Sequence, residues 1–157
     1  MREKILKTNS ESDTADLGRS IGKALEEGTV IGLRGTLGAG KTRLTQAIAI
    51  ELGIADGQVT SPTFTICVPH EGRLGLLHLD AYRIKDPSEV DELGLDEHVE
   101  NGVVLIVEWA ERIVKLLPPV DLSISIKPLE AQKREFTFVA NTEKGNALLN
   151  AVSPPPQ

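Results

Sequence analysis

Apolar residues recur along the chain with two different periods, and each period predicts a different kind of element. In residues 10–27 they recur every three or four positions, which is typical of an amphipathic helix. The run 29–34 predicts a buried strand, and the continuous apolar run 103–107 predicts one that is buried on both faces. The other elements that the pattern predicts are an edge strand at 3–7, helices at 43–50 and 87–93, strands at 64–69, 74–82, 122–126 and 136–139, and a last helix capped by Asn141 or Thr142.

Polar and small residues at the ends of these elements set their expected boundaries. Ser10 or Ser12 is placed to cap the first helix, and Gly28 is placed to end it. Asp86 is placed to cap the helix that follows it. Residues 70–73, His-Glu-Gly-Arg, lie between two strand-like runs and are typical of a hairpin, so part of the sheet should be antiparallel.

Strand and helix patterns alternate along the chain, which predicts a fold of the α/β class. We expect three layers around a mostly parallel central sheet with antiparallel edge strands. For a chain of 157 residues, a single domain over residues 1–152 is the natural expectation. The proline-rich tail, 153–157, is expected to be disordered.

Composition and charge narrow the classes of function. With 40% hydrophobic residues the chain can bury a core, and a net charge of −6 disfavours a broad basic surface for nucleic acid, although a local RNA contact stays open. The single cysteine, Cys67, allows no internal disulfide and fits a reducing compartment. No apolar run is long enough to span a bilayer, and residues 1–4 lack the apolar segment of a signal peptide. We therefore expect a cytoplasmic protein without membrane contact.

The octapeptide 35–42, Gly-Thr-Leu-Gly-Ala-Gly-Lys-Thr, carries the strongest chemical signal in the chain. It matches the phosphate-binding pattern G-x-x-x-x-G-K-[ST] in full, between a predicted strand and a predicted helix. The glycines let backbone N–H groups surround an anion, and the helix N-terminus adds partial positive charge. Lys41 would reach the β- and γ-phosphates, and the Thr42 hydroxyl would bind Mg²⁺. The alternative is a glycine-rich turn with a chance lysine; the complete pattern favours a P-loop NTPase-like domain.

Two acidic residues end predicted strands and are candidates for chemistry beyond nucleotide binding. Glu108 follows the run 103–107, where a metal-organising acid is usually found in this kind of fold, and Asp80 ends the second hairpin strand. The alternative for each is a solvated acid at a strand end.

Four further residues near these acids have two open interpretations each. His78 shares a strand face with Asp80, and a hydrogen-bonded structural histidine is favoured over a catalytic one. Trp109 is either part of the core or an exposed anchor for a partner. Tyr82 and Arg83 are either ordinary surface residues or contacts to phosphate or to a partner.

Four motifs taken together resemble one known family. They are, in order, L-G-A-G-K-T at 37–42, S-P-T-F at 61–64, H-L-D-A-Y-R at 78–83 and V-E-W at 107–109. From about Ser10 to Arg134 their order and spacing are similar to those of the TsaE family, the bacterial ATPases of tRNA threonylcarbamoyladenosine biosynthesis.

The resemblance implies a small Mg²⁺-dependent ATPase that is weak alone and acts with proteins of the TsaB and TsaD families. Together these install threonylcarbamoyladenosine in tRNAs that read codons starting with A, and the ATPase is not itself the transferase. ATP, ADP and Mg²⁺ are the implied ligands, and tRNA is reached through the complex.

The resemblance also implies a set of site residues. Residues 61–63 correspond to a switch-like loop. The catalytic residues implied are Lys41, Asp80 and Glu108; the nucleotide contacts are Glu11, Leu37, Gly38, Ala39, Gly40, Lys41, Thr42 and Arg134; and the Mg²⁺ ligands are Thr42 and Glu108.

Two other functions stay open on the same fold. A small-molecule or nucleoside kinase usually carries an arginine-rich lid, and no arginine-dense segment is present in the sequence. A GTPase switch or a module that holds nucleotide as a structural ligand is the other, and the guanine-specific string N-K-x-D is absent from the sequence.

Overall fold

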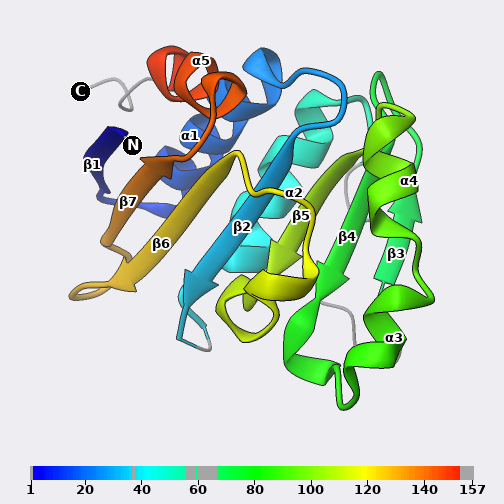
Figure 1. Cartoon of the computed structure of the whole chain (residues 1–157). Coiled ribbons are helices and arrows are strands. Elements are labelled where there is room, and N and C mark those ends of the chain that lie inside the picture. The colour runs from blue at the N-terminus through cyan, green and yellow to red at the C-terminus, as the bar shows by residue number, and fades with distance from the viewer. Residues whose placement is uncertain (1, 37, 56–58, 60–66, 153–157) are drawn as a thin grey trace.

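The computed structural model describes residues 2–36, 38–55, 59 and 67–152, and its centre is a seven-stranded mixed sheet (Figure 1). The strands are β1 (Arg2–Thr8), β2 (Val30–Gly35), β3 (Cys67–His70), β4 (Leu76–Asp80), β5 (Val104–Glu108), β6 (Leu122–Pro128) and β7 (Arg134–Ala140). The α-helices are α1 (Glu11–Ala24), α2 (Lys41–Glu51), α3 (Pro87–Asp91), α4 (Leu95–Glu100) and α5 (Glu143–Ala151). Short 3-10 helices span Ala81–Arg83, Ala110–Arg112 and Val114–Leu116.

The strand order is β1-β7-β6-β2-β5-β4-β3, and its centre is parallel. Strands β6, β2, β5 and β4 pair in parallel, whereas β1, β7 and β3 join the sheet through antiparallel pairs. This confirms the predicted sheet. Because parallel neighbours run toward the same edge, the carboxyl-terminal parts of β2, β4 and β5 lie together: Glu108 is opposite Asp80 on one side and Leu33 on the other.

Two apolar clusters, one on each face of the sheet, produce the three layers. Helices α1, α2 and α5 cover one face, where Leu17, Leu44 and Leu148 pack with even-numbered positions of β5 such as Ile106. On the other face Val90 and Leu95, from α3 and α4, pack with odd-numbered positions such as Leu105. Figure 1 shows α1 and α2 behind the sheet and α3 and α4 in front of β3–β5.

Helices α1 and α2 approach closely because α1 has glycine on its contact side. A Cβ atom on Gly18 would lie 2.5 Å from Cβ of Ala47, and one on Gly22 would lie 2.6 Å from Cβ of Glu51. Any larger residue there would push the helices apart. The close contact holds α2 against α1, and with it the start of α2, where the octapeptide ends.

Local capping residues behave as the sequence predicts. Ser10 caps α1 by accepting from the backbone N–H of Asp13 at 3.1 Å. Thr142 caps α5, and Asp86 caps α3 with a complete capping box. Of the alternatives Ser10 or Ser12, and Asn141 or Thr142, the structure selects Ser10 and Thr142.

Three predicted boundaries are wrong. Helix α1 ends at Ala24 instead of near residue 27, because Leu25 is extended (ψ 134°). The strand predicted to reach Tyr82 stops at Asp80, because the Asp80 carboxylate accepts from the Tyr82 N–H and starts a 3-10 turn. His70 lies in β3 and not in the hairpin turn.

Some expected features lie outside the described residues or were not predicted. The first part of the predicted strand 64–69 and the tail 153–157 fall outside the described ranges. Helix α4, which no pattern predicted, begins after Gly94 with no side-chain cap. None of the helices in the described ranges is both long enough and apolar enough to cross a membrane.

Candidate functional site

The octapeptide forms the connection between the central strand β2 and helix α2, and its glycines have the backbone angles that such a loop requires. Gly35, Gly38 and Gly40 have φ values of 153°, 79° and 110°, in the region that favours glycine. A Cβ atom on Gly35 would also lie 2.8 Å from the carbonyl oxygen of Ile126. Gly40 is the residue before α2, so the N–H groups of the first helical turn lie at the loop. Leu37 lies outside the described residues.

Lys41 is buried, and its ammonium group is turned back onto its own loop. Nζ donates to the carbonyl oxygens of Gly35 at 2.6 Å and Thr36 at 2.9 Å, and it lies 4.0 Å from the centre of the Trp109 ring. Burial lowers the pKa of Lys41 from its usual value, and the nearby carboxylates of Glu108 and others partly offset this. The lysine is therefore a desolvated cation held by two backbone carbonyl groups. An anion bound in the loop would compete with these carbonyls for the ammonium group.

Thr42 and Glu108 bring two oxygen donors together at the end of the sheet. The Thr42 hydroxyl donates to both carboxylate oxygens of Glu108, at 3.2 Å and 3.1 Å. Glu108 is only 4% exposed, although it ends a strand. The interpretation of Glu108 as a solvated strand-end acid is therefore wrong.

Asp80 lies beside Glu108 in the sheet register and is also buried, at 7% exposure. One oxygen of Asp80 accepts from the Tyr82 N–H at 3.0 Å, and the other is 3.4 Å from Nε of Arg83. Burial raises the pKa of Asp80; the Tyr82 hydrogen bond opposes this shift, and the Glu108 charge adds to it. This acid therefore caps a turn and is also a carboxylate whose ionised form is disfavoured by its surroundings.

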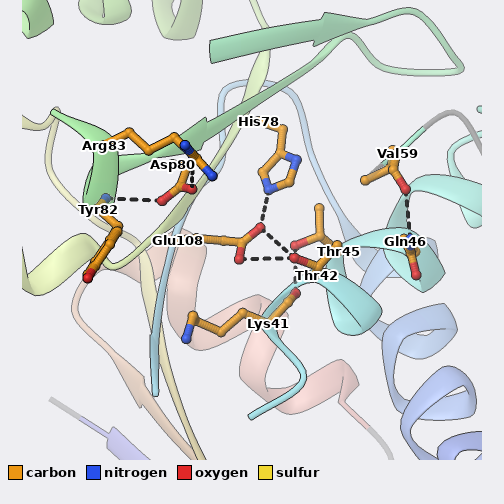
Figure 2. A network of polar contacts seen from close by, with 10 residues as sticks. All are labelled: Lys41, Thr42, Thr45, Gln46, Val59, His78, Asp80, Tyr82, Arg83 and Glu108. Atoms are coloured by element: carbon orange, nitrogen blue, oxygen red, sulfur yellow. Dashed lines mark hydrogen bonds and ion pairs between the residues drawn. The ribbon is translucent and has the colours of Figure 1, made fainter. Parts of the chain in front are cut away.

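His78 lies behind these acids on the same strand face. It is fully buried, and its Nε2 atom is 2.5 Å from the second carboxylate oxygen of Glu108. The predicted hydrogen bond of this histidine is confirmed, and its partner is the candidate metal-organising acid. Figure 2 shows the imidazole pointing at the Glu108 carboxylate, to which the Thr42 hydroxyl is also hydrogen-bonded.

One cavity of about 330 Å³ joins these groups. The described residues that line it come from the loop, from the start of α2 and from the ends of β4 and β5: Gly38, Gly40, Lys41, Thr42, Arg43, Asp80, Tyr82, Arg83, Glu108 and Trp109. Residues that the sequence separates by up to 71 positions, from Gly38 to Trp109, thus share one surface. The structure brings together Lys41, Thr42, Asp80 and Glu108.

Three implied nucleotide contacts lie outside this cavity. Ala39 is fully buried, and its carbonyl oxygen accepts a hydrogen bond from Nε of Arg134 at 3.1 Å. Arg134 therefore holds the backbone of the loop and does not line the cavity. Glu11 is exposed at the start of α1 and pairs with Arg43 at 3.0 Å. A second cavity, of about 450 Å³, is lined by residues that are close in sequence to Glu11 and Arg134: Lys7, Thr8, Asn9, Leu129, Glu130 and Lys133.

The sequence pointed to Trp109 and Tyr82 as possible contacts, but it did not indicate that the Trp109 ring lies against Lys41. Trp109 has a φ of 61°, which is unusual for a residue with a side chain. Its half-buried ring contacts Lys41 and also lies near the Tyr82 ring, with the two ring centres 5.0 Å apart. Tyr82 is 57% exposed and also faces the guanidinium of Arg112 at 5.1 Å. No sequence pattern indicates a left-handed tryptophan, so this contact is visible only in three dimensions.

The donor set fits Mg²⁺ that arrives with phosphate. In the described part of the chain, no group of three or more His, Cys, Asp or Glu side chains is placed to hold a metal ion. Mg²⁺ in nucleotide sites is usually held by one or two protein oxygens, with phosphate and water completing the shell. The adjacent oxygens of Thr42 and Glu108 fit that pattern.

The glycine loop between a central parallel strand and a helix, with a buried acid ending the next strand, defines the P-loop NTPase-like class of protein. A sequence model of the family described as "Threonylcarbamoyl adenosine biosynthesis protein TsaE" matches residues 8–136. The chain therefore belongs to the TsaE family, which confirms the resemblance of the four motifs.

Individual relatives agree with this assignment. The tRNA threonylcarbamoyladenosine biosynthesis protein TsaE of Treponema pallidum is 40% identical over 83% of this chain and 96% of its own length. The protein of the same name from Bacillus subtilis is 40% identical over 89% of this chain and 87% of its own. The crystal structure of Bacillus subtilis YdiB superposes with a TM-score of 0.79 at 32% identity, covering 96% of this chain and 94% of that one.

Proposed function

We propose that this protein is a Mg²⁺-dependent ATPase that supports threonylcarbamoyladenosine modification of tRNAs reading codons that start with A. It acts in the cytoplasm with partners of the TsaB and TsaD type, and it does not itself transfer the threonylcarbamoyl group. The observation that carries the proposal is that Lys41, Thr42, Asp80 and Glu108 line one shared cavity. Membership of the TsaE family supports the tRNA pathway.

ATP binding would rest on the loop and on Lys41. The N–H groups at the start of α2 and the positive-φ glycines suit a phosphate, which accepts many hydrogen bonds at once. Lys41 would exchange its bonds to Gly35 and Thr36 for phosphate oxygens, which carry full negative charge.

Thr42 and Glu108 would hold Mg²⁺, because their oxygens already lie side by side. When bound, the ion supplies charge neutralisation for the β- and γ-phosphates. Glu108 is hydrogen-bonded to both Thr42 and His78, whereas Asp80 accepts its hydrogen bond from the Tyr82 N–H. Asp80 is thus the acid left to orient the attacking water, and its raised pKa makes it a better proton acceptor.

Tyr82 and Trp109 would form part of the partner surface at the mouth of the cavity. The exposed Tyr82 ring and the half-buried Trp109 ring are large and partly apolar, like the residues that anchor protein interfaces. Because Trp109 also touches Lys41, a partner that moves the ring would affect the loop. The switch-like segment 61–63 lies outside the described residues and stays a prediction.

A phosphate-release assay tests this proposal. We expect slow hydrolysis with ATP and Mg²⁺ alone, no transfer to small acceptors, and a rise when the TsaB and TsaD type partners and tRNA are added. The two arginines that line the cavity, Arg43 and Arg83, are already paired with the carboxylates of Glu11 and Asp80, so an outside group is expected to help neutralise the developing charge. Rapid phosphate transfer to a nucleoside would favour a kinase, and hydrolysis that ignores the partners would contradict an accessory role.

A further inference from the structure

His78 belongs to none of the groups that would touch nucleotide, yet it holds the residue that would touch Mg²⁺. It lies in β4, with β3 on one side and β5 on the other, and is 0% exposed. It does not line the cavity with Asp80 and Glu108. A polar ring in such a place is costly to bury unless it makes a hydrogen bond.

Within the described part of the chain, the Glu108 carboxylate is hydrogen-bonded to two side chains. Thr42 binds both oxygens from the cavity side, and His78 binds one oxygen from inside the sheet (Figure 2). A cation bound between Thr42 and Glu108 would compete with the Thr42 hydroxyl hydrogen for the two carboxylate oxygens of Glu108. The His78 contact does not involve the Thr42 hydroxyl, so it is the one that such a cation leaves in place.

The ring has a defined hydrogen-bonding sense. An ionised carboxylate only accepts, so Nε2 of His78 carries the hydrogen and donates to Glu108. The other ring nitrogen, Nδ1, is buried and has no hydrogen-bond partner among the described residues. The imidazole is therefore directed toward Glu108 alone within that part of the structure.

We propose that His78 is a positioning residue: its Nε2–H fixes the rotamer of Glu108 so that the carboxylate faces Thr42 and is preorganised for Mg²⁺. A glutamate side chain has several rotatable bonds, and without a fixed partner it would lose entropy each time the ion binds. Outer partners of this kind typically change metal affinity by about 10–100-fold when removed. The inference rests on the proposed function, because it assigns His78 a role toward the ion that Thr42 and Glu108 would hold.

Two substitutions at His78 and one matched control separate positioning from packing. His78→Leu supplies an apolar side chain of similar bulk and removes the donor, whereas His78→Gln places an amide donor near the Nε2 position. Ile106→Val changes the residue opposite His78 in the register, equally buried on the same face, without touching a hydrogen bond. Circular dichroism and thermal melting identify the folded fraction of each.

The measured quantity is ATP affinity as a function of Mg²⁺, followed by the fluorescence of the single tryptophan beside Lys41. For His78→Leu we expect the Mg²⁺ concentration at half-maximal effect to rise at least about tenfold, with affinity in EDTA within about twofold of the parent. His78→Gln should restore most of this loss, and Ile106→Val should only lower the melting temperature. Nitrogen-15 spectra of the histidines should show Nε2 as the protonated nitrogen of His78, with a shift in Glu108→Gln.

Each contrary outcome has one meaning. A folded His78→Leu protein with parental Mg²⁺ dependence overturns the role of His78 and leaves the proposed function intact. Equal loss in His78→Gln and His78→Leu also overturns it, because the donor would then not matter. A parent protein whose nucleotide binding ignores Mg²⁺ overturns the proposed function and this inference with it.

Discussion

Replacing Lys41 with alanine should weaken nucleotide binding strongly while the fold survives. In the structure Nζ makes two charge-assisted hydrogen bonds, to Gly35 and Thr36, and lies against the Trp109 ring. Binding would exchange these for bonds to phosphate, so the lost affinity is the difference between the two sets. If that difference is one hydrogen bond to a charged group, it amounts to about 1.5–3 kcal/mol. The expected loss of affinity is then about tenfold to a hundredfold.

The effect on stability should be smaller, because two opposing terms change together. The substitution leaves two loop carbonyls without their donor, but it also removes a cation whose burial is costly. A net loss of about 1–2 kcal/mol would lower the melting temperature by roughly 2–8 °C in a chain of this size.

Isothermal titration calorimetry with ATP and Mg²⁺ measures the affinity, and a thermal melt measures the stability. Lys115→Ala, at an exposed lysine of the 3-10 helix Val114–Leu116, removes the same charge away from the cavity and should leave both values unchanged. Unchanged ATP affinity in a folded Lys41→Ala protein would refute the assignment of the loop.

Three other substitutions have distinct expected results. Glu108→Ala should lower ATP hydrolysis at least about tenfold, which is about 1.4 kcal/mol of barrier, while ATP and ADP still bind; parental turnover with partners present would refute its role. Asp80→Asn should lower hydrolysis by a similar factor and, because the Asn oxygen keeps the Tyr82 hydrogen bond, should not destabilise the fold at neutral pH. Because the folded pKa of Asp80 is raised above its unfolded value of 3.8, the protein loses stability as pH rises through the folded pKa and Asp80 ionises. In thermal melts at neutral pH the Asp80→Asn protein should therefore have the higher melting temperature, and this difference from the parent should disappear as pH falls toward 3.8. A difference in melting temperature that does not depend on pH would contradict this. Trp109→Ala should weaken the complex with the partner proteins more than it lowers the melting temperature, and a large loss of stability with partner affinity preserved would make Trp109 a packing residue.

The local rules of sequence were sufficient for the sheet and for the phosphate loop. Alternation and apolar runs located β1, β2, β5, β6 and β7, because a strand buried on one or both faces must place apolar side chains accordingly. Caps at Ser10, Asp86 and Thr142 were predictable because a helix N-terminus needs acceptors that short polar side chains supply. The glycine pattern of the loop was likewise a direct consequence of its backbone angles.

The tertiary structure decided which chemical groups meet. The sequence placed Asp80 and Glu108 at strand ends, but only the pairing of β4 with β5 makes them neighbours and buries both. The bond from His78 to Glu108 depends on two strands whose residues are 30 positions apart. Trp109 reaches Lys41 through a backbone angle that no residue pattern encodes. Local sequence determines where elements begin and end, because capping and periodicity act over a few residues; the site arises from pairing between distant strands, so its geometry and its charges exist only once the sheet has formed.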